Sequence, residues 1–163
     1  MRKWHIPAMI TVVIALFGLL LIVGCDEGFS YHPDGWNPQG KKGGWKKEWS
    51  DLSIRTWRIL GLNGSDAISV EFEITNKTEM TLDLQSAELV AKGRSYFPSL
   101  WNGQGKNSSG RTIQPKMVRR LPVKFSLGGQ SPVPVILGPR PHIVLSFREG
   151  SQSKKISIPY VSR

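Results

Sequence analysis

The sequence predicts an all-β fold, an antiparallel β-sandwich of about seven or eight short strands. From Asp51 onward, apolar residues recur at every second position, which is the period of a strand with one buried face. Clusters of Gly, Pro, Asn and Ser separate these alternating segments, as turns separate strands. After residue 25, no stretch carries the 3.6-residue apolar period that a helix of three turns requires.

The first two alternating segments are typical of half-buried strands. LSIRTWRIL changes the parity of its apolar positions after Ile54, which predicts a bulge near Arg55 and Thr56. AISVEFEIT alternates without interruption and sends two acids, Glu71 and Glu73, to the face opposite its apolar side chains. The polar residues NKTE then turn the chain.

Further segments complete the predicted sheets. TLDL and SAELVAK give one or two strands, SYFP gives a short one, and LPVKFSL alternates again. The proline-rich stretch GGQSPVPVILGPRP predicts a crossing connection. PHIVLSFR and KKISIPYV give the last two strands. Pro159 predicts that the final strand lies at a sheet edge, because proline cannot donate a ladder hydrogen bond.

Three of these stretches together resemble the immunoglobulin-like domains of small bacterial lipoproteins and cell-surface accessory proteins: ISVEFEITNKTEMTLDLQSAELVAKGRSYFPS, QPKMVRRLPVKFSL and KKISIPY. The resemblance covers about residues 52–161 and implies an immunoglobulin-like sandwich. It implies little about activity. Because the chain has a single cysteine, the disulfide of antibody domains is excluded.

Residues 1–24 have the layout of an export signal. Arg2 and Lys3 precede an apolar stretch from Ile6 to Gly24 that carries no charge. The positive end stays in the cytoplasm, so the rest of the chain is exported. An apolar run of this length is also long enough to span a bilayer as a permanent anchor, which is the alternative interpretation.

Cys25, the only cysteine of the chain, favours a cleaved signal. Together with the preceding Ile22, Val23 and Gly24 it resembles the lipobox of bacterial lipoproteins. The resemblance implies that Cys25 receives a diacylglyceryl group and becomes the first residue of the mature protein, held by two or three acyl chains. In enteric bacteria, Asp after this cysteine is associated with retention in the inner membrane. Asp26 therefore implies the inner membrane over the outer, and the start of a solvated tether is the alternative.

Residues 25–50 are rich in Gly, Pro, Lys and Trp and show no apolar period, so we expect a flexible linker before a sandwich domain at residues 51–163. Four lysines and three tryptophans are interleaved in it, which suits an anionic interface. Tryptophans that cover the edge of the folded domain are the alternative. The residues are Trp36, Lys41, Lys42, Trp45, Lys46, Lys47 and Trp49.

The mature chain would carry a formal net charge of +8, because removal of Arg2 and Lys3 leaves 20 basic and 12 acidic residues. Charges in residues 25–50 cancel, so the excess belongs to the sandwich. We expect a basic surface for an anionic lipid, an envelope polymer or an acidic protein, whereas nucleic acid is not expected for an exported protein. Charge that only keeps the domain soluble is the alternative. The surface would comprise Arg111, Lys116, Arg119, Arg120 and Lys124.

The sequence predicts no catalytic residue, no metal site and no cofactor. Histidines, carboxylates and the single cysteine show no metal-ligand spacing, and no nucleophile or phosphate-loop motif is present. Glu71 and Glu73 lie about 7 Å apart along a strand, near the separation in inverting glycosidases, but a solvated sheet face gives the same spacing. In the loop SLWNGQGKNSSG, Trp101 and Asn102 are a candidate for binding sugars or proteins, and a plug for one end of the sandwich is the alternative.

These patterns predict a membrane-anchored, non-catalytic binding or assembly module of the cell envelope, facing the periplasm or the exterior. One rival is a structural accessory subunit that adds its sheet edge to a strand of a larger complex. The other is a carbohydrate-active enzyme that uses Glu71 and Glu73.

Overall fold

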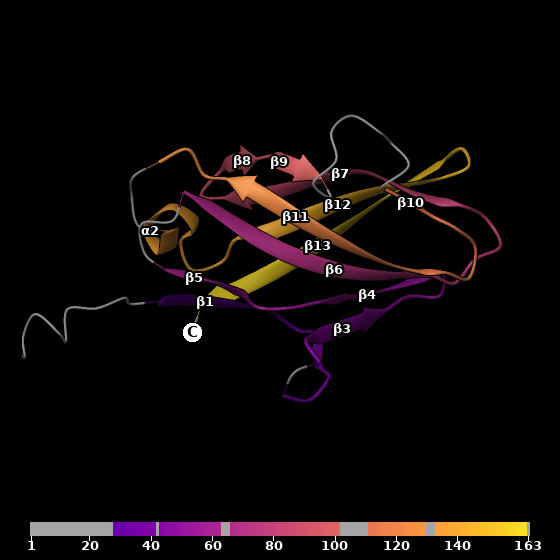
Figure 1. Cartoon of the computed structure of the whole chain (residues 1–163), viewed down its shortest axis with the longest axis horizontal. Coiled ribbons are helices and arrows are strands. Elements are labelled where there is room, and N and C mark those ends of the chain that lie inside the picture. Colours follow the sequence, from indigo (N-terminus) through magenta and orange to yellow (C-terminus); the bar gives the residue numbers. More distant parts are fainter. Residues whose placement is uncertain (1–27, 42, 63–65, 102–110, 130–132, 163) are drawn as a thin grey trace, which may run out of the picture.

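The computed structural model describes residues 28–41, 43–62, 66–101, 111–129 and 133–162 of the chain. These residues form two antiparallel sheets that pack face to face, which confirms the all-β, immunoglobulin-like sandwich (Figure 1). The first sheet has the order β10 (Thr112–Ile113), β7 (Leu82–Ala91), β12 (His142–Glu149), β13 (Gln152–Ser162), β1 (Gly28–Pro33) and β5 (Ile59–Leu62), and β8 (Arg94–Tyr96) also pairs with β7. The second has the order β2 (Asn37–Pro38), β3 (Trp45–Glu48), β4 (Leu52–Thr56), β6 (Ala67–Asn76), β11 (Val118–Ser126) and β9 (Pro98–Trp101).

The core lies between the two sheets and is built by the alternating apolar side chains. Because successive residues of a strand point to opposite faces, a period of two sends one set of side chains inward. Five aromatic side chains are fully buried there and remove the largest apolar areas from water. They are Tyr31, Phe72, Phe125, Phe147 and Tyr160.

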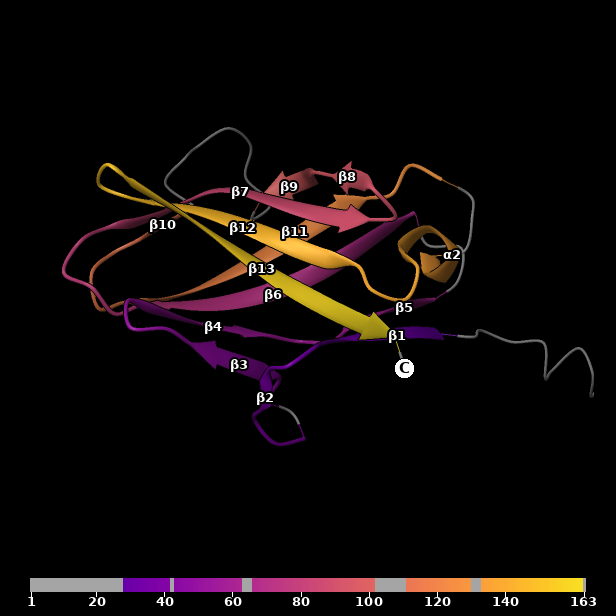
Figure 2. The ribbon, with the colours of Figure 1, turned by 180° about the vertical axis from the view of Figure 1, so that it is seen from behind.

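The strongly alternating segments form the long strands, as expected. β6 pairs with β11 over nine residue pairs, from Ala67 opposite Ser126 to Thr75 opposite Val118. β12 and β13 form a hairpin that crosses behind β6 at an angle in the view of Figure 1. In the view from behind, both strands lie in front of β6 (Figure 2). TLDL and SAELVAK form a single strand, β7, in which Gln85 is the extra residue of a bulge opposite β12.

The parity change in LSIRTWRIL marks a crossing between sheets, so the predicted bulge is wrong. Leu52 and Ile54 are buried in β4 of the second sheet, and the strand ends at Thr56. Trp57 and Arg58 carry the chain across, and Ile59 is buried in β5 of the first sheet. The two halves have opposite parity because they face the core from opposite sheets.

The predicted linker is wrong for residues 28–50, which belong to the folded domain. β1 lies between β13 and β5 in the first sheet, and β3 pairs with β4 in the second. The hydroxyl of the buried Tyr31 donates a hydrogen bond to the carbonyl oxygen of Gly138 at 3.0 Å. Trp36 is only 5% exposed and packs against Trp49 edge to face. Isolated aromatic anchors therefore hold a segment that has no apolar period.

β13 is not the last strand of its sheet, because β1 pairs with its final residues. Proline is nevertheless placed where the ladder tolerates it. The amide of Tyr160 donates to Pro141, beside β12, so the nitrogen of Pro159 points away from β12. On the side that faces away from β12, the amide of Asp34 donates to the carbonyl of Pro159 at 2.8 Å. Because proline has no amide hydrogen, the only ladder bond lost is one from residue 159 back to Asp34.

A short helix, α2 (Val133–Leu137), closes one end of the sandwich within the proline-rich crossing. Val133 and Leu137 are buried against the core, and the carbonyl of Val135 accepts a hydrogen bond from the ammonium group of Lys92. Among the described residues, no helix is long and apolar enough to cross a membrane.

Candidate functional site

The β2–β3 hairpin folds over the point where the chain crosses between the sheets. Gly44 has a φ of +71°, and a Cβ there would lie 2.5 Å from the carbonyl oxygen of Thr56 and 3.2 Å from the ring of Trp57. Only glycine combines this backbone conformation with so close an approach. The amide of Gln39 donates to the carbonyl of Gly44 at 2.8 Å and closes the hairpin.

A cleft of about 550 Å³ lies between this hairpin and the first sheet, a volume within the range of ligand sites. We call it the Trp45 cleft. Its walls come from β1, from the hairpin and from the crossing that leads into β5. The lining residues are His32, Pro38, Gly40, Lys41, Gly44, Trp45, Trp57, Arg58 and Leu60.

Aromatic and cationic side chains are packed together in the Trp45 cleft. The rings of His32 and Trp45 are stacked, with centroids 5.9 Å apart and an interplanar angle of 30°. The guanidinium carbon of Arg58 lies 5.2 Å from the centroid of Trp45, within the range of a cation–π contact. Trp45 and Trp57 are both partly exposed, and Leu60 is 64% exposed. The cleft therefore offers apolar surface and positive charge side by side.

The charge of the Trp45 cleft has one sign. Lys41 and Arg58 line it, and no carboxylate stands among its described lining residues. The Nδ1 atom of His32 is buried and has no hydrogen-bond partner among the described residues.

The residues of the predicted basic surface lie on several different elements of the domain. Arg120 and Lys124 lie on the outer face of β11, Arg111 lies beside β7, and Lys116 lies in the turn before β11. Several of these cations have partners within the domain. Arg120 pairs with Glu73 at 2.9 Å, and Lys116 pairs with Glu79 at 2.9 Å. Arg119 donates to the carbonyl of Thr112 at 2.9 Å, and Arg111 to that of Gln85 at 3.2 Å.

Glu71 and Glu73 share the outer face of β6, as expected, and both interact with arginine. Glu73 lies 3.3 Å from Arg55 of β4 and 2.9 Å from Arg120 of β11, so it joins three neighbouring strands. Glu71 lies 3.9 Å from Arg120. Neither residue lines the Trp45 cleft. The geometry gives this pair the role of a cross-strand charge network.

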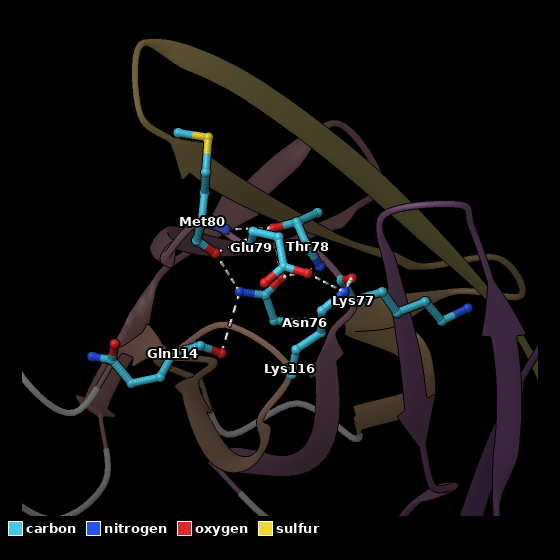
Figure 3. A network of polar contacts seen from close by, with 7 residues as sticks. All are labelled: Asn76, Lys77, Thr78, Glu79, Met80, Gln114 and Lys116. Atoms are coloured by element: carbon cyan, nitrogen blue, oxygen red, sulfur yellow. Dashed lines mark hydrogen bonds and ion pairs between the residues drawn. The ribbon is translucent and has the colours of Figure 1, made fainter.

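Asn76, the last residue of β6, connects the turn that follows β6 to the segment that precedes β11 (Figure 3). Its buried amide donates to the carbonyls of Met80, Ile113 and Gln114 at 2.7, 3.1 and 3.3 Å, and its carbonyl oxygen accepts from Thr78. Lys116 adopts a φ of +57° nearby, and its ammonium group donates to the carbonyl of Lys77. These contacts pair backbone carbonyl groups within the domain, so the geometry gives Asn76 and Lys116 a structural role.

A second, smaller cleft of about 260 Å³ lies along the β7 bulge. It is polar, and its charged groups interact with one another: Asp83 accepts from Thr112 at 2.8 Å and lies 3.8 Å from Arg148. In the part of the chain that the structure describes, no group of three or more His, Cys, Asp or Glu residues is arranged to hold a metal ion.

Several predicted site residues lie outside the described residues. They are Asn102 and the rest of its loop, Asp26, Cys25 and the lipobox residues Ile22, Val23 and Gly24. The backbone of Trp101 ends β9, opposite Val123 of β11.

Sequence reasoning missed the Trp45 cleft. Its residues His32, Lys41 and Trp45 fall within the predicted linker of residues 25–50, and no sequence pattern marks Arg58 and Leu60. The indication was the parity change at Trp57, which brings the chain from one sheet to the other beside β1.

Comparison with known proteins shows the fold. No family model matches the chain, and no curated protein matches it. Among solved structures, a functionally unknown protein from Listeria monocytogenes EGD-e is similar with a TM-score of 0.51 at 13% identity, over 70% of this chain and 79% of that chain. The GAE domain of yeast GGA1 gives a TM-score of 0.37 at 10% identity, over 72% and 95%.

Proposed function

We propose that this chain is a membrane-anchored, non-catalytic binding module of the bacterial cell envelope, and that it binds its partner through the Trp45 cleft. The signal layout of residues 1–24 and the lipobox resemblance support an anchor through lipid on Cys25. Asp26 favours the inner membrane. The partner is an anionic envelope polymer or an envelope protein, and the site faces the periplasm or the exterior.

The Trp45 cleft is the observation that carries the binding role. It combines exposed apolar rings with cationic side chains in a concavity whose walls belong to paired strands and a closed hairpin. Ligand sites have this composition, a largely apolar lining with a few polar groups that fix orientation. A sandwich supports such a role because its sheets hold the connecting segments rigidly.

The anchor is tested by labelling cells with a radioactive fatty acid. We expect the label to enter the wild-type protein and not the Cys25→Ser variant, and the mature protein to begin at Cys25. A protein that begins at Met1 and carries no label would replace the lipid anchor with a spanning helix.

The binding role is tested with full-length protein in nonionic detergent and detergent-washed cell-wall fragments. We expect the protein to sediment with the fragments, and Lys41→Gln/Arg58→Gln to reduce the sedimented fraction. Arg94→Gln/Lys155→Gln removes the same charge at exposed positions on β8 and β13, outside the cleft, and should sediment like the wild type. Equal losses in both double variants would show that overall charge, not the cleft, holds the protein.

A structural accessory role is the second candidate, and the edge of β13 favours it. Residues 152–159 pair with β12, whereas β1 pairs only with residues 160–162. By the alternation of an antiparallel ladder, the amides of Ser153, Lys155 and Ser157 point away from β12. Such an edge can accept a strand from a partner, while a lysine on it limits indiscriminate pairing.

Ser157→Pro tests this second role, because it removes an outward amide without removing a bond to β12. If the edge receives a partner strand, the variant should lose that partner in a cross-linking pull-down from intact cells and keep its fold by circular dichroism. An unchanged set of cross-linked partners would exclude docking at this edge.

A further inference from the structure

We propose that the ligand of the Trp45 cleft is an acidic saccharide, a sugar ring that bears a phosphate or a carboxylate. This inference rests on the binding function proposed above and names its ligand class. The charge and the ring surfaces of the cleft point to two different parts of such a ligand.

The anionic group would lie between Arg58 and Lys41. Both side chains are exposed, and no carboxylate among the described lining residues competes for them. A guanidinium presents a planar fork of donors that fits a carboxylate or a phosphate, and hydrogen bonds between ions are stronger than neutral ones. Arg58 also lies over the ring of Trp45, and this cation–π contact favours that position before a ligand arrives.

The sugar ring would pack against the aromatic side chains. Trp45 and Trp57 are both partly exposed and line the cleft, one on the hairpin and one on the crossing between sheets. The C–H groups of a sugar give it an apolar face, which suits an indole, while its hydroxyl groups remain free for hydrogen bonds.

An acidic peptide fits the cleft less well. Extended peptides gain affinity from main-chain hydrogen bonds to a free strand edge. The edge strands β5 and β2 contribute Leu60 and Pro38 to the Trp45 cleft, but β5 has only four residues and Pro38 has no amide to donate, whereas the lining contains several ring side chains. Ring stacking and a single anionic group describe a charged sugar better than an extended chain.

The experiment follows the indole N–H resonances of Trp45 and Trp57 in full-length protein in nonionic detergent micelles. Trp45→Phe and Trp57→Phe assign the two signals. Glucose 1-phosphate and glucuronic acid are the ligands, and glucose is the neutral match. Inorganic phosphate tests the anion without a sugar ring, and triglutamate tests an acidic peptide. Phosphatidylglycerol added to the micelles tests the phosphate of a lipid headgroup.

We expect both acidic sugars to shift the two resonances. Their dissociation constants should be lower than those of glucose and inorganic phosphate by a factor of about ten or more. Lys41→Gln/Arg58→Gln should weaken that binding by about tenfold or more, and Arg94→Gln/Lys155→Gln should leave it within twofold. Arg58→Lys keeps the charge without the fork and should give an intermediate affinity.

Three results would overturn the proposal: equal binding of glucose and the acidic sugars, tighter binding of triglutamate or phosphatidylglycerol, or equal weakening in both double variants. Failure here can be told apart from failure of the proposed function. If the acidic sugars do not bind but Lys41→Gln/Arg58→Gln still releases the protein from wall fragments, the cleft remains the binding site and only the ligand class is wrong.

Discussion

Thr56 and Tyr160 join the two sheets through a hydrogen bond in the core. Their hydroxyl oxygens lie 3.0 Å apart, and the hydroxyl of Thr56 also donates to the carbonyl of Glu71 at 3.1 Å. Tyr160 therefore donates and Thr56 accepts. Burial raises the pKa of Tyr160 well above its ordinary value. Burial also raises the pKa of Tyr31.

Stability should therefore fall as the pH rises above about 10, the ordinary pKa of tyrosine. In that range the unfolded chain loses the proton of Tyr160 while the folded protein keeps it, so the free energy of unfolding decreases by up to about 1.4 kcal/mol per pH unit. Tyr160→Phe should be less stable by about 1 kcal/mol at pH 7 and should lose stability less steeply above pH 10. Urea unfolding at pH 7, 10 and 11 measures both effects, and parallel pH curves for the two proteins would contradict the argument.

Asn76 requires an amide, because its nitrogen donates to three carbonyls and its oxygen accepts from Thr78. Asn76→Ala should lower the free energy of unfolding by about 2–4 kcal/mol, since it leaves these backbone groups unpaired. Asn76→Asp should cost at least as much, because a carboxylate cannot donate to the carbonyls. Asn37→Asp, at an exposed position on β2, should cost less than about 0.5 kcal/mol. Urea unfolding measures these changes. If Asn76→Asp unfolds with the same free energy as the wild type, the amide of Asn76 is not required.

At the scale of elements, the β2–β3 hairpin creates the cleft, and Gly44 allows it to dock. Gly44→Ala should lower the free energy of unfolding by about 2–4 kcal/mol, because it adds a clash with the carbonyl of Thr56 to the strain of a positive φ. Gly35→Ala is the matched control, since Gly35 has a φ of +69° and no atom within 4 Å of a Cβ. It should cost about 1–2 kcal/mol. Equal melting temperatures for the two variants would mean that the close approach at Gly44 is not required.

β1 and the segment after it are expected to be essential for folding. A chain that begins at residue 51 lacks β1, which pairs with both β13 and β5, and lacks the buried Tyr31 and Trp36. Such a chain should show no cooperative thermal transition, whereas one that begins at residue 28 should melt cooperatively. Near-ultraviolet circular dichroism reports the packing of the aromatic side chains in both. A chain from residue 51 that melts like the longer one would restore the linker interpretation.

Sequence reasoning predicted the elements whose pattern is local. β6, β11, β12 and β13 alternate over their whole length, and one buried face suffices to define them. It missed β1 because single aromatic residues in a Gly-, Pro- and Lys-rich segment show no period. It read a sheet crossing as a bulge because both shift the parity by one residue. The cleft was out of reach, since it depends on pairing between β1 and β5, which are distant in sequence.

At the scale of the molecule, the charges of the sandwich divide into two kinds. On the outer face of the second sheet, arginines and glutamates of neighbouring strands pair, as Arg55, Glu73 and Arg120 do. Arg120 is largely exposed, so its pair with Glu73 contributes little to stability, and such pairs neutralise part of the positive charge that the sequence shows. At the Trp45 cleft, by contrast, Arg58 lies over an aromatic ring, and no carboxylate is among the described residues that line the cleft. Net charge alone did not reveal this difference.

The folded domain begins close to the proposed anchor. Two residues lie between Cys25 and Gly28, the first residue of β1, and the three Cα–Cα steps span at most about 11 Å. The Trp45 cleft includes His32 of the same strand, about 13 Å further along at 3.3 Å per residue. A lipid on Cys25 would thus hold the cleft within about 25 Å of the bilayer, nearer than a tether ending at residue 50 would.

The most direct test of a binding module is to cross-link the cleft in living cells. A photoreactive amino acid replaces Leu60, which is exposed in the Trp45 cleft, or Val118, which is exposed on β11 away from it. We predict that light produces a heavier adduct from position 60 and not from position 118. The adduct should disappear with Lys41→Gln/Arg58→Gln and persist with Arg94→Gln/Lys155→Gln. The absence of any adduct at position 60, or an adduct that survives the loss of Lys41 and Arg58, would contradict a binding role for the cleft.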